Sequence, residues 1–271
     1  MLLATCADLP DLEPEDRPLV PALRALGLEV GIGVWTNPSM DWGAARAVVI
    51  RSVWDYHLRH DAFLRWAGGV PRLWNPLELV RWNASKAYLR DLAAWGFPTI
   101  PTVWVDAGGT VAELPAGWDM CVVKPLVSAS AYQTLKTRDR AAIATHAAGL
   151  AGALVQPYVA GVEREGERAL VFLDGVFSHA IRKAPALGGG DVHAYAVVPA
   201  AGDEVELASQ VLARVGETLY ARVDVVRDDR GGLLVMELEL VEPSLYFTRV
   251  PGAAERLAEA IARRQRGSRS S

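Results

Sequence analysis

Two strand-like runs joined by a short turn constrain the fold of this chain more than any other part of it. In "LLVMELEL", apolar residues alternate with Glu237 and Glu239, which is the pattern of a half-buried strand. Both glutamates then share one face, with Cα atoms roughly 7 Å apart. The run "YARVDVV" carries Asp224 between apolar residues, and the intervening "RDDRGG" predicts a hairpin turn. The two strands are therefore expected to be antiparallel neighbours, which can place Asp224 beside Glu237 or Glu239.

Carboxylates gathered on one face of a sheet repel one another unless a cation lies between them. Hard oxygen ligands suit Mg²⁺, which usually keeps some coordination positions for substrate phosphates. A nucleotide site is therefore one interpretation of this hairpin. The alternative is the solvated face of an edge strand, which two alternating glutamates alone do not exclude.

The composition is that of an ordinary soluble globular protein. Of 271 residues, 51% are hydrophobic and 22% are charged, and the net charge of -4 gives no reason to expect binding to nucleic acid or to an anionic membrane. Cys6 and Cys121 lie in apolar runs without metal-ligand spacing. We expect both to be reduced and buried, and the protein to be cytoplasmic.

The chain divides into three units by pattern. Residues 1–80 alternate strand-like and helix-like runs, which predicts a small parallel sheet covered on both faces. Residues 81–155 begin with the helix-like "NASKAYLRDLAAWG" and continue with strands at "IPTVWV" and "MCVVKP". Residues 156–271 are rich in strands and end in a helix. The fold class is α/β, with α+β subdomains.

Lysine is rare in this sequence. Arginine outnumbers it 24 to 4, and Lys124 lies inside the apolar run "CVVKP", where a free ammonium group is costly to bury. A flexible point charge directed at phosphate would explain a lysine at this position. The alternative is a lysine whose apolar stem is buried and whose charge reaches solvent.

Six segments in order resemble the ATP-grasp superfamily, and within it the glutathione-synthetase-like ligases, including D-cycloserine synthetase-like proteins. They are "SKAYL", "CVVKP", "VQPYV", "EGERALVFLDGVFSHAIRK", "YARVDVV" and "ELELVEPSL". The resemblance covers Asn83 to about Phe247, and the first unit is similar to the domain that precedes the ATP-grasp fold in those ligases. It implies an ATP-grasp fold behind a Rossmann-like pre-ATP-grasp domain.

The resemblance also implies a set of nucleotide-binding residues. Lys86 and Lys124 match the lysines that reach the nucleotide, and either Glu163 or Glu167 matches the acid that binds the ribose. The hinge beside adenine corresponds to Gln156, Pro157, Tyr158 and Val159. The loop over the phosphates corresponds to "VSASAY", with Ser128 and Ser130, where relatives usually have glycines.

For catalysis, the resemblance implies that Arg168, Arg182 and Lys124 face the phosphates and the acyl-phosphate. Asp224, Glu237 and Glu239 fall on the metal ligands, with Mg²⁺ as the expected ion and Mn²⁺ as the alternative. The family usually has asparagine where this chain has Glu239, and Glu242 could add to the metal site or to amine recognition.

The substrate is expected at the end of the strand "AVVIRS", because ligands of open α/β sheets bind at the carboxyl edge. The candidate substrate residues are Arg51, Ser52, Trp54, Asp55, Glu242 and Ser244. For Trp54 the alternative is an ordinary core aromatic. "GGGD", residues 188–191, has the flexibility expected of either an active-site lid or a surface loop.

The function implied by the resemblance is an ATP- and Mg²⁺-dependent carboxylate–amine ligase that activates a small acid as an acyl-phosphate and releases ADP and phosphate. Three alternatives stay open: an intramolecular cyclising ligase of D-cycloserine synthetase type, a nucleotide-binding protein without ligase activity, and a ligase that tags a protein partner. The expected partners are small-molecule carboxylates and amines, not nucleic acid or membrane, and a homo-oligomer is possible.

Overall fold

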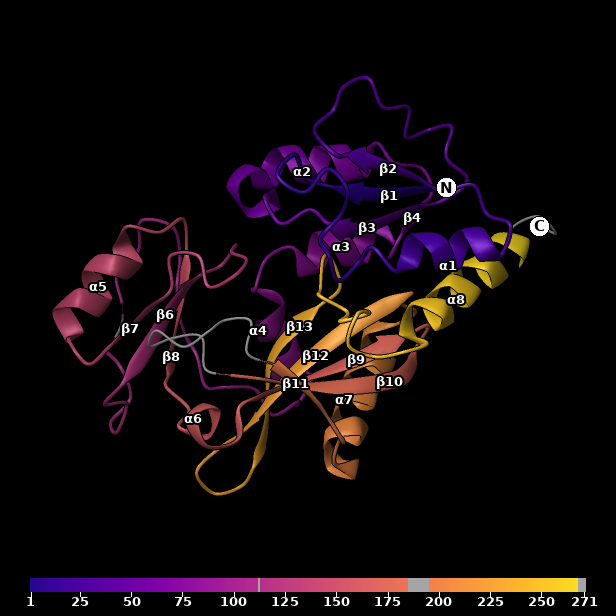
Figure 1. The fold of residues 1–271 in the computed structure, drawn as a ribbon. Helices are drawn as coiled ribbons and strands as arrows, with labels where there is room; N and C mark the ends of the chain where they lie inside the picture. The colour runs from indigo at the N-terminus through magenta and orange to yellow at the C-terminus, as the bar shows by residue number, and fades with distance from the viewer. Residues whose placement is uncertain (112, 185–194, 268–271) are drawn as a thin grey trace.

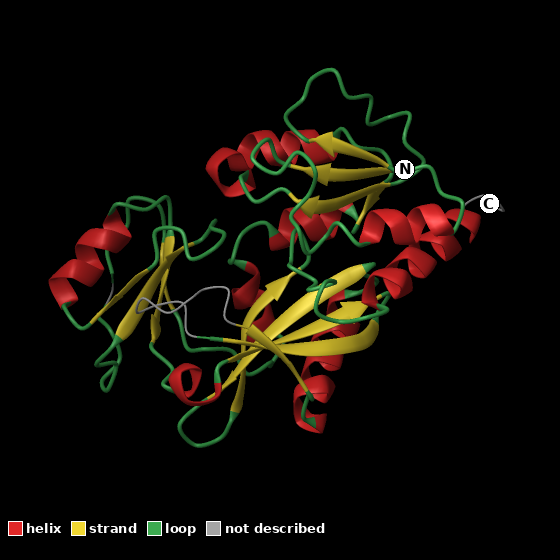
Figure 2. Ribbon diagram, in the orientation of Figure 1, coloured by secondary structure: helices red, strands yellow, loops and turns green. Residues whose placement is uncertain are grey.

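A computed structural model describes residues 1–111, 113–184 and 195–267, which form three sheets with helices packed around them (Figure 1). Figure 2 shows helices both on the outer faces of the sheets and between the first and third sheets. In the described part of the chain, no helix has both the length and the apolar character needed to cross a membrane.

The first sheet is parallel, as predicted. Its order is β2 (Gly31–Val34), β1 (Leu2–Thr5), β3 (Val48–Ser52) and β4 (Leu73–Trp74). Successive side chains point to opposite faces, so Leu3 packs with α1 (Leu19–Ala25) and α8 (Ala253–Gly267), whereas Ala4 packs with α2 (His60–Gly68). A short 3₁₀ helix, η1 (Tyr56–Arg59), and α3 (Leu77–Asn83) complete this part.

The second sheet is antiparallel and has a core of its own. Its order is β5 (Val103–Val105), β8 (Ala153–Pro157), β6 (Cys121–Pro125) and β7 (Leu135–Thr137). Ile143 on α5 (Arg140–Ala148) packs against it, and α4 (Tyr88–Ala94) precedes it in the chain. Cys121 lies in this core and, like Cys6, is buried with a free thiol, as predicted.

The third sheet is also antiparallel, in the order β11 (Tyr195–Val198), β10 (Val176–Lys183), β9 (Glu167–Leu173), β12 (Tyr220–Arg227) and β13 (Leu233–Glu239). One face packs on α7 (Gly202–Val215), and the other packs partly on α8. A short helix, α6 (Gly161–Glu165), precedes β9. The hairpin prediction is confirmed, because β12 and β13 pair with Asp224 opposite Glu237.

Asn75 joins the first sheet to the third. Its side-chain amide donates to the carbonyl oxygens of Tyr220 and Leu240, each at 2.9 Å, and its carbonyl oxygen accepts from the Leu219 amide at 2.6 Å. The residue is fully buried. Its three hydrogen bonds therefore connect the end of β4 to β12 and β13 where no solvent can replace them.

His179 on β10 predicts how stability depends on pH. Its Nε2 lies 3.1 Å from the Leu245 carbonyl oxygen, its side chain is 6% exposed, and burial lowers its pKa to about 4. Because the unfolded chain takes up this proton below about pH 6.5 and the folded protein does not, acid favours unfolding by about 2 kcal/mol between pH 7 and pH 5. Buried acids such as Glu167 and Glu242, whose pKa values are raised, act in the opposite direction, so the test is the difference between parent and variant. Urea unfolding at both pH values should show that acidification costs the parent protein about 2 kcal/mol more than it costs His179→Gln, and an equal change in both proteins would contradict the assignment.

Candidate active site

A cavity of about 680 Å³ is lined by residues of the second and third sheets and by segments that follow strands of the first sheet. Its lining is apolar at the hinge, where Ile100, Val122, Val159, Val162 and Met236 contribute side chains. Charged side chains gather where β9, β12 and β13 meet. The cavity therefore offers an apolar slot next to a charged region, which suits a ligand with one apolar and one ionic part.

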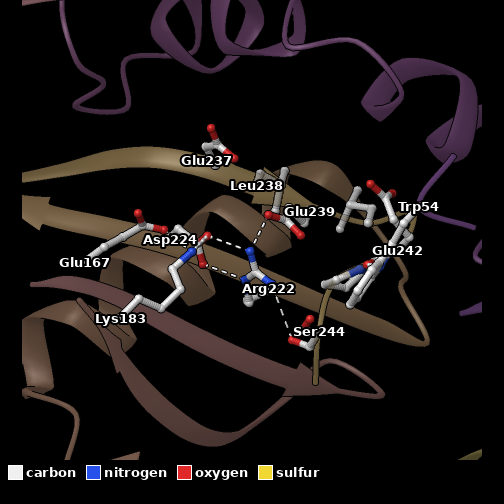
Figure 3. Close-up of polar contacts among 12 residues, drawn as sticks. Trp54, Glu167, Lys183, Arg222, Asp224, Glu237, Leu238, Glu239, Glu242 and Ser244 are labelled. Carbon is white, nitrogen blue, oxygen red and sulfur yellow. Dashed lines mark hydrogen bonds and ion pairs between the residues drawn. The ribbon is translucent and has the colours of Figure 1, made fainter. Parts of the chain in front are cut away.

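The three predicted metal ligands lie together. One oxygen atom of each of Asp224, Glu237 and Glu239 lies within 4.8 Å of the others. Asp224 is fully buried, whereas the two glutamates are partly exposed and line the cavity (Figure 3). The alternative of a merely solvated strand face is therefore wrong for these residues.

Arg222 and Lys183 neutralise the buried part of this cluster. Arg222 donates to both oxygens of Asp224, at 2.8 and 2.9 Å, and also binds Glu239 (Figure 3). Lys183 binds the second Asp224 oxygen at 2.8 Å and also binds Glu167. Burial alone would raise the pKa of Asp224, but Arg222 and Lys183 outweigh it and hold this pKa well below its ordinary value.

Lys86 and Lys124 bind Glu237. Their ammonium groups lie 3.4 and 3.2 Å from its Oε1 atom. Burial opposes ionisation of Glu237, but the two lysines prevail and lower its pKa to about 2. Glu237 is thus an anion throughout the neutral range, held between two cations that reach it from the start of α4 and from β6.

Burial raises the pKa values of Glu13, Glu167, Glu239 and Glu242, which also line this cavity. Burial raises the pKa of Glu167 to about 7; Lys183 opposes this change and Asp224 adds to it. Burial, with the nearby charge of Glu239, raises the pKa of Glu242 to about 8. These groups therefore bind protons more readily than Glu237, although all of them line one cavity.

Comparisons with known proteins show which family this chain resembles. A model of the D-cycloserine synthetase DcsG N-terminal domain matches residues 1–75. The cycloserine biosynthesis protein DcsG of Streptomyces lavendulae is 36% identical to the chain, over 91% of the chain and 92% of that protein. The crystal structure of D-cycloserine synthetase DcsG superposes with a TM-score of 0.88, at 33% identity over 97% of this chain and 99% of that one. A RimK-domain ATP-grasp protein from Sphaerobacter thermophilus superposes with a TM-score of 0.71, at 20% identity over 97% of this chain and 100% of that one.

The chain belongs to the DcsG group of the ATP-grasp family. The resemblance inferred from sequence is confirmed, and so is the fold class. As an ATP-grasp ligase, the protein uses ATP to join a carboxylate to an amine through a C–N bond.

The residues predicted for the hinge and for the phosphate loop line the cavity. Gln156, Pro157, Tyr158 and Val159 line the cavity at the end of β8, and Ser128 and Ser130 line it from the loop after β6. In that loop, Ser130, Ala131 and Gln133 have φ values of 49°, 56° and 51°. Glycine adopts this left-handed conformation at least cost, so serine, alanine and glutamine are less favourable than glycine would be here.

The two ribose candidates are separated. Glu167 lines the cavity beside Lys183 and Asp224. Glu163 lies beside the hinge, where it accepts a 2.5 Å hydrogen bond from the Tyr158 hydroxyl and pairs with Lys136 at 3.1 Å. All four lysines of the chain therefore pair with acids at the cavity or its hinge.

The placement of Arg168 and Arg182 opposite the phosphates is wrong. Neither residue lines the cavity, because both lie on the sheet face opposite to Glu167 and Lys183. Arg168 instead donates to the Pro199 carbonyl oxygen at 2.6 Å and pairs with Glu204 at the start of α7. Arg182 is exposed.

Three of the predicted substrate residues do not reach the cavity. Arg51 is fully buried, pairs with Asp16 at 2.8 Å and donates to the Pro243 carbonyl oxygen at 2.6 Å. Ser52 donates to Asp16, and Asp55 accepts from the Trp35 indole at 2.7 Å. Ser52 still contacts the cavity wall indirectly, because its hydroxyl accepts from the amide of Glu13, which lines the cavity. Trp54, Glu242 and Ser244 do line the cavity, so Trp54 is not a core aromatic. The loop at residues 188–191 lies outside the described residues.

The sequence analysis missed Arg222, Lys183 and the acids Glu13 and Glu15, which also line the cavity. Arg222 had a usable signal, because it precedes Asp224 by two residues on one strand and so shares its face. Lys183 is one of only four lysines in the sequence. Strand alternation indicates which sheet face its side chain is on, but not that Glu167 and Asp224 lie beside it. Glu13 and Glu15 lie in an irregular segment, where no periodicity indicates direction.

Proposed function

We propose that this ligase closes a ring within one small molecule that carries both the carboxylate and the nitrogen nucleophile. The support is the similarity to the cycloserine biosynthesis protein DcsG over nearly the whole of both chains, and to the crystal structure of D-cycloserine synthetase. Joining two separate molecules is the alternative, and it would use the same cavity.

The donor set fits a divalent cation. Three carboxylates converge, Asp224 and Glu237 have lowered pKa values, and oxygen ligands of this kind suit Mg²⁺, with Mn²⁺ as a substitute. Asp224, Glu237 and Glu239 would hold the ion. A bound ion supplies positive charge that stabilises the phosphoryl group during transfer.

The cations around the cluster have complementary tasks. Lys86 and Lys124 reach into the cavity from two different elements, which suits them to neutralise phosphate oxygens. Arg222 lines the cavity while its guanidinium is fixed on Asp224, so it presents a directed positive charge where the carboxylate is activated. The apolar side chains at the hinge would bind the adenine.

The remaining lining residues suit the substrate. The cavity lining also includes Glu13, Glu15, Trp54, Glu242 and Ser244. Their side chains combine an aromatic surface with carboxylates, which suits a small substrate bearing an amine. No side chain is required as a covalent nucleophile, so positioning and charge neutralisation carry the reaction.

Product analysis tests ring closure directly. The purified protein with ATP and Mg²⁺ should release ADP when given a single compound that carries both a carboxylate and a nitrogen nucleophile, and mass spectrometry should show its cyclic product. A matched compound with the nucleophile removed should release no ADP above background. ADP formation that requires a separate acid and amine would replace ring closure by intermolecular ligation.

A further inference from the structure

Side chains bind the outer edge of β13 around Leu238, whereas earlier on the strand the Val235 amide donates to the Pro98 carbonyl oxygen at 2.7 Å. β13 is the last strand of its sheet, and such an edge normally leaves main-chain groups unpaired. Here the Leu238 amide donates to the Tyr88 hydroxyl at 2.8 Å. The Asn83 side chain donates to the Leu238 carbonyl oxygen at 2.8 Å and accepts from the Leu240 amide at 2.7 Å.

These contacts fall between and beside the two glutamates of the proposed metal site. Leu238 separates Glu237 from Glu239 on the strand (Figure 3). A shift of pairing by one residue turns every side chain of a strand to the opposite face. Fixing both main-chain groups of Leu238 therefore keeps both glutamates directed at the cavity, while the Leu238 side chain packs in the core under α7.

Both contacting side chains are buried, although both also border the cavity. Asn83 is 6% exposed and Tyr88 is 3% exposed. The segment between them carries Lys86, whose ammonium binds Glu237 and whose main-chain amide donates to the Leu126 carbonyl oxygen at 2.7 Å. One short segment thus contacts the strand of the two glutamates and the end of β6.

We propose that Asn83 and Tyr88 are positioning residues, which set the direction of Glu237 and Glu239 and thereby the affinity of the site for a divalent cation. The proposal rests on the metal role assigned to these glutamates under the proposed function. Asn83 and Tyr88 act through main-chain groups of β13 and are not themselves ligands.

Two nearly isosteric variants separate positioning from ligation. Tyr88→Phe removes only the hydroxyl, and Asn83→Asp keeps the acceptor for the Leu240 amide but removes the donor to Leu238. Mn²⁺ would be titrated into the full-length protein with a non-hydrolysable ATP analogue and followed by electron paramagnetic resonance. We expect the Kd for Mn²⁺ to rise by about ten-fold in each variant, as for other residues that orient metal ligands.

Turnover provides a second measurement. The Mg²⁺ concentration for half-maximal activity should rise in parallel, while kcat at saturating Mg²⁺ falls much less, which a general loss of folded protein would not produce. Ile261→Val, in the core under α8, is the control for small losses of stability and should leave the Kd for Mn²⁺ unchanged.

The results test the positioning role of Asn83 and Tyr88 separately from the metal-binding role of Glu237. A Kd for Mn²⁺ within two-fold of the parent protein in both folded variants overturns the positioning role, as does an equal rise in Ile261→Val. Glu237→Gln is the separate test of the metal site. If this variant weakens Mn²⁺ binding and the other two do not, positioning fails alone; if it does not weaken binding, the metal assignment fails with it.

Discussion

Replacing Glu237 by glutamine should reduce ATP turnover on the order of 10³-fold, because a metal ion contributes several kcal/mol of charge stabilisation to phosphoryl transfer. The substitution keeps the size of the side chain but removes the charge that binds Lys86 and Lys124 and would bind the cation. ADP release in a coupled assay measures the effect, and circular dichroism should show an unchanged fold.

A matched substitution controls for the change of glutamate to glutamine. Glu255 is exposed on α8, on the far side of the third sheet from α7, and Glu255→Gln should turn over ATP at the parent rate. Activity of Glu237→Gln within ten-fold of the parent protein would show that Glu237 is not a metal ligand.

The largest effect on stability is expected at Asn75. Asn75→Ala leaves the Leu219 amide and the carbonyl oxygens of Tyr220 and Leu240 without their side-chain partners. A buried polar group that loses its partner costs roughly 1–3 kcal/mol, so the variant should lose about 4 kcal/mol of unfolding free energy. Urea denaturation followed by tryptophan fluorescence measures this loss.

Asn37 offers the comparison. It is exposed and accepts one hydrogen bond, from the Ser39 amide, so Asn37→Ala should cost less than about 1 kcal/mol. If the two variants unfold at similar urea concentrations, the junction between the first and third sheets does not depend on Asn75.

The parts of the site that follow from strand periodicity could be predicted. Alternation placed Glu237 and Glu239 on one face, and the short turn after "YARVDVV" implied the pairing with Asp224 that the structure confirms. The parallel first sheet followed in the same way from alternating helices and strands. These predictions depend on contacts that are local in the sequence.

Long-range partners could not be predicted. Arg51 has the appearance of a substrate-binding arginine at a strand end, but Asp16, 35 residues earlier, binds it in the interior. The direction of the Arg168 side chain could be predicted only by knowing which face of the third sheet α7 covers. That helix begins more than 30 residues later in the sequence. The hydrogen bonds from Asn83 and Tyr88 to β13 join residues that are more than 100 positions apart in the sequence.

The packing of α8 has a consequence for biosynthesis. Leu257 and Ile261 from this last helix complete the same core as Leu3, Leu19 and Val49 from the first unit. While the ribosome is still making the second and third sheets, this apolar side of the first sheet is covered by α1 but not yet by α8. We therefore expect the nascent N-terminal part to need shielding from aggregation until the final helix leaves the exit tunnel.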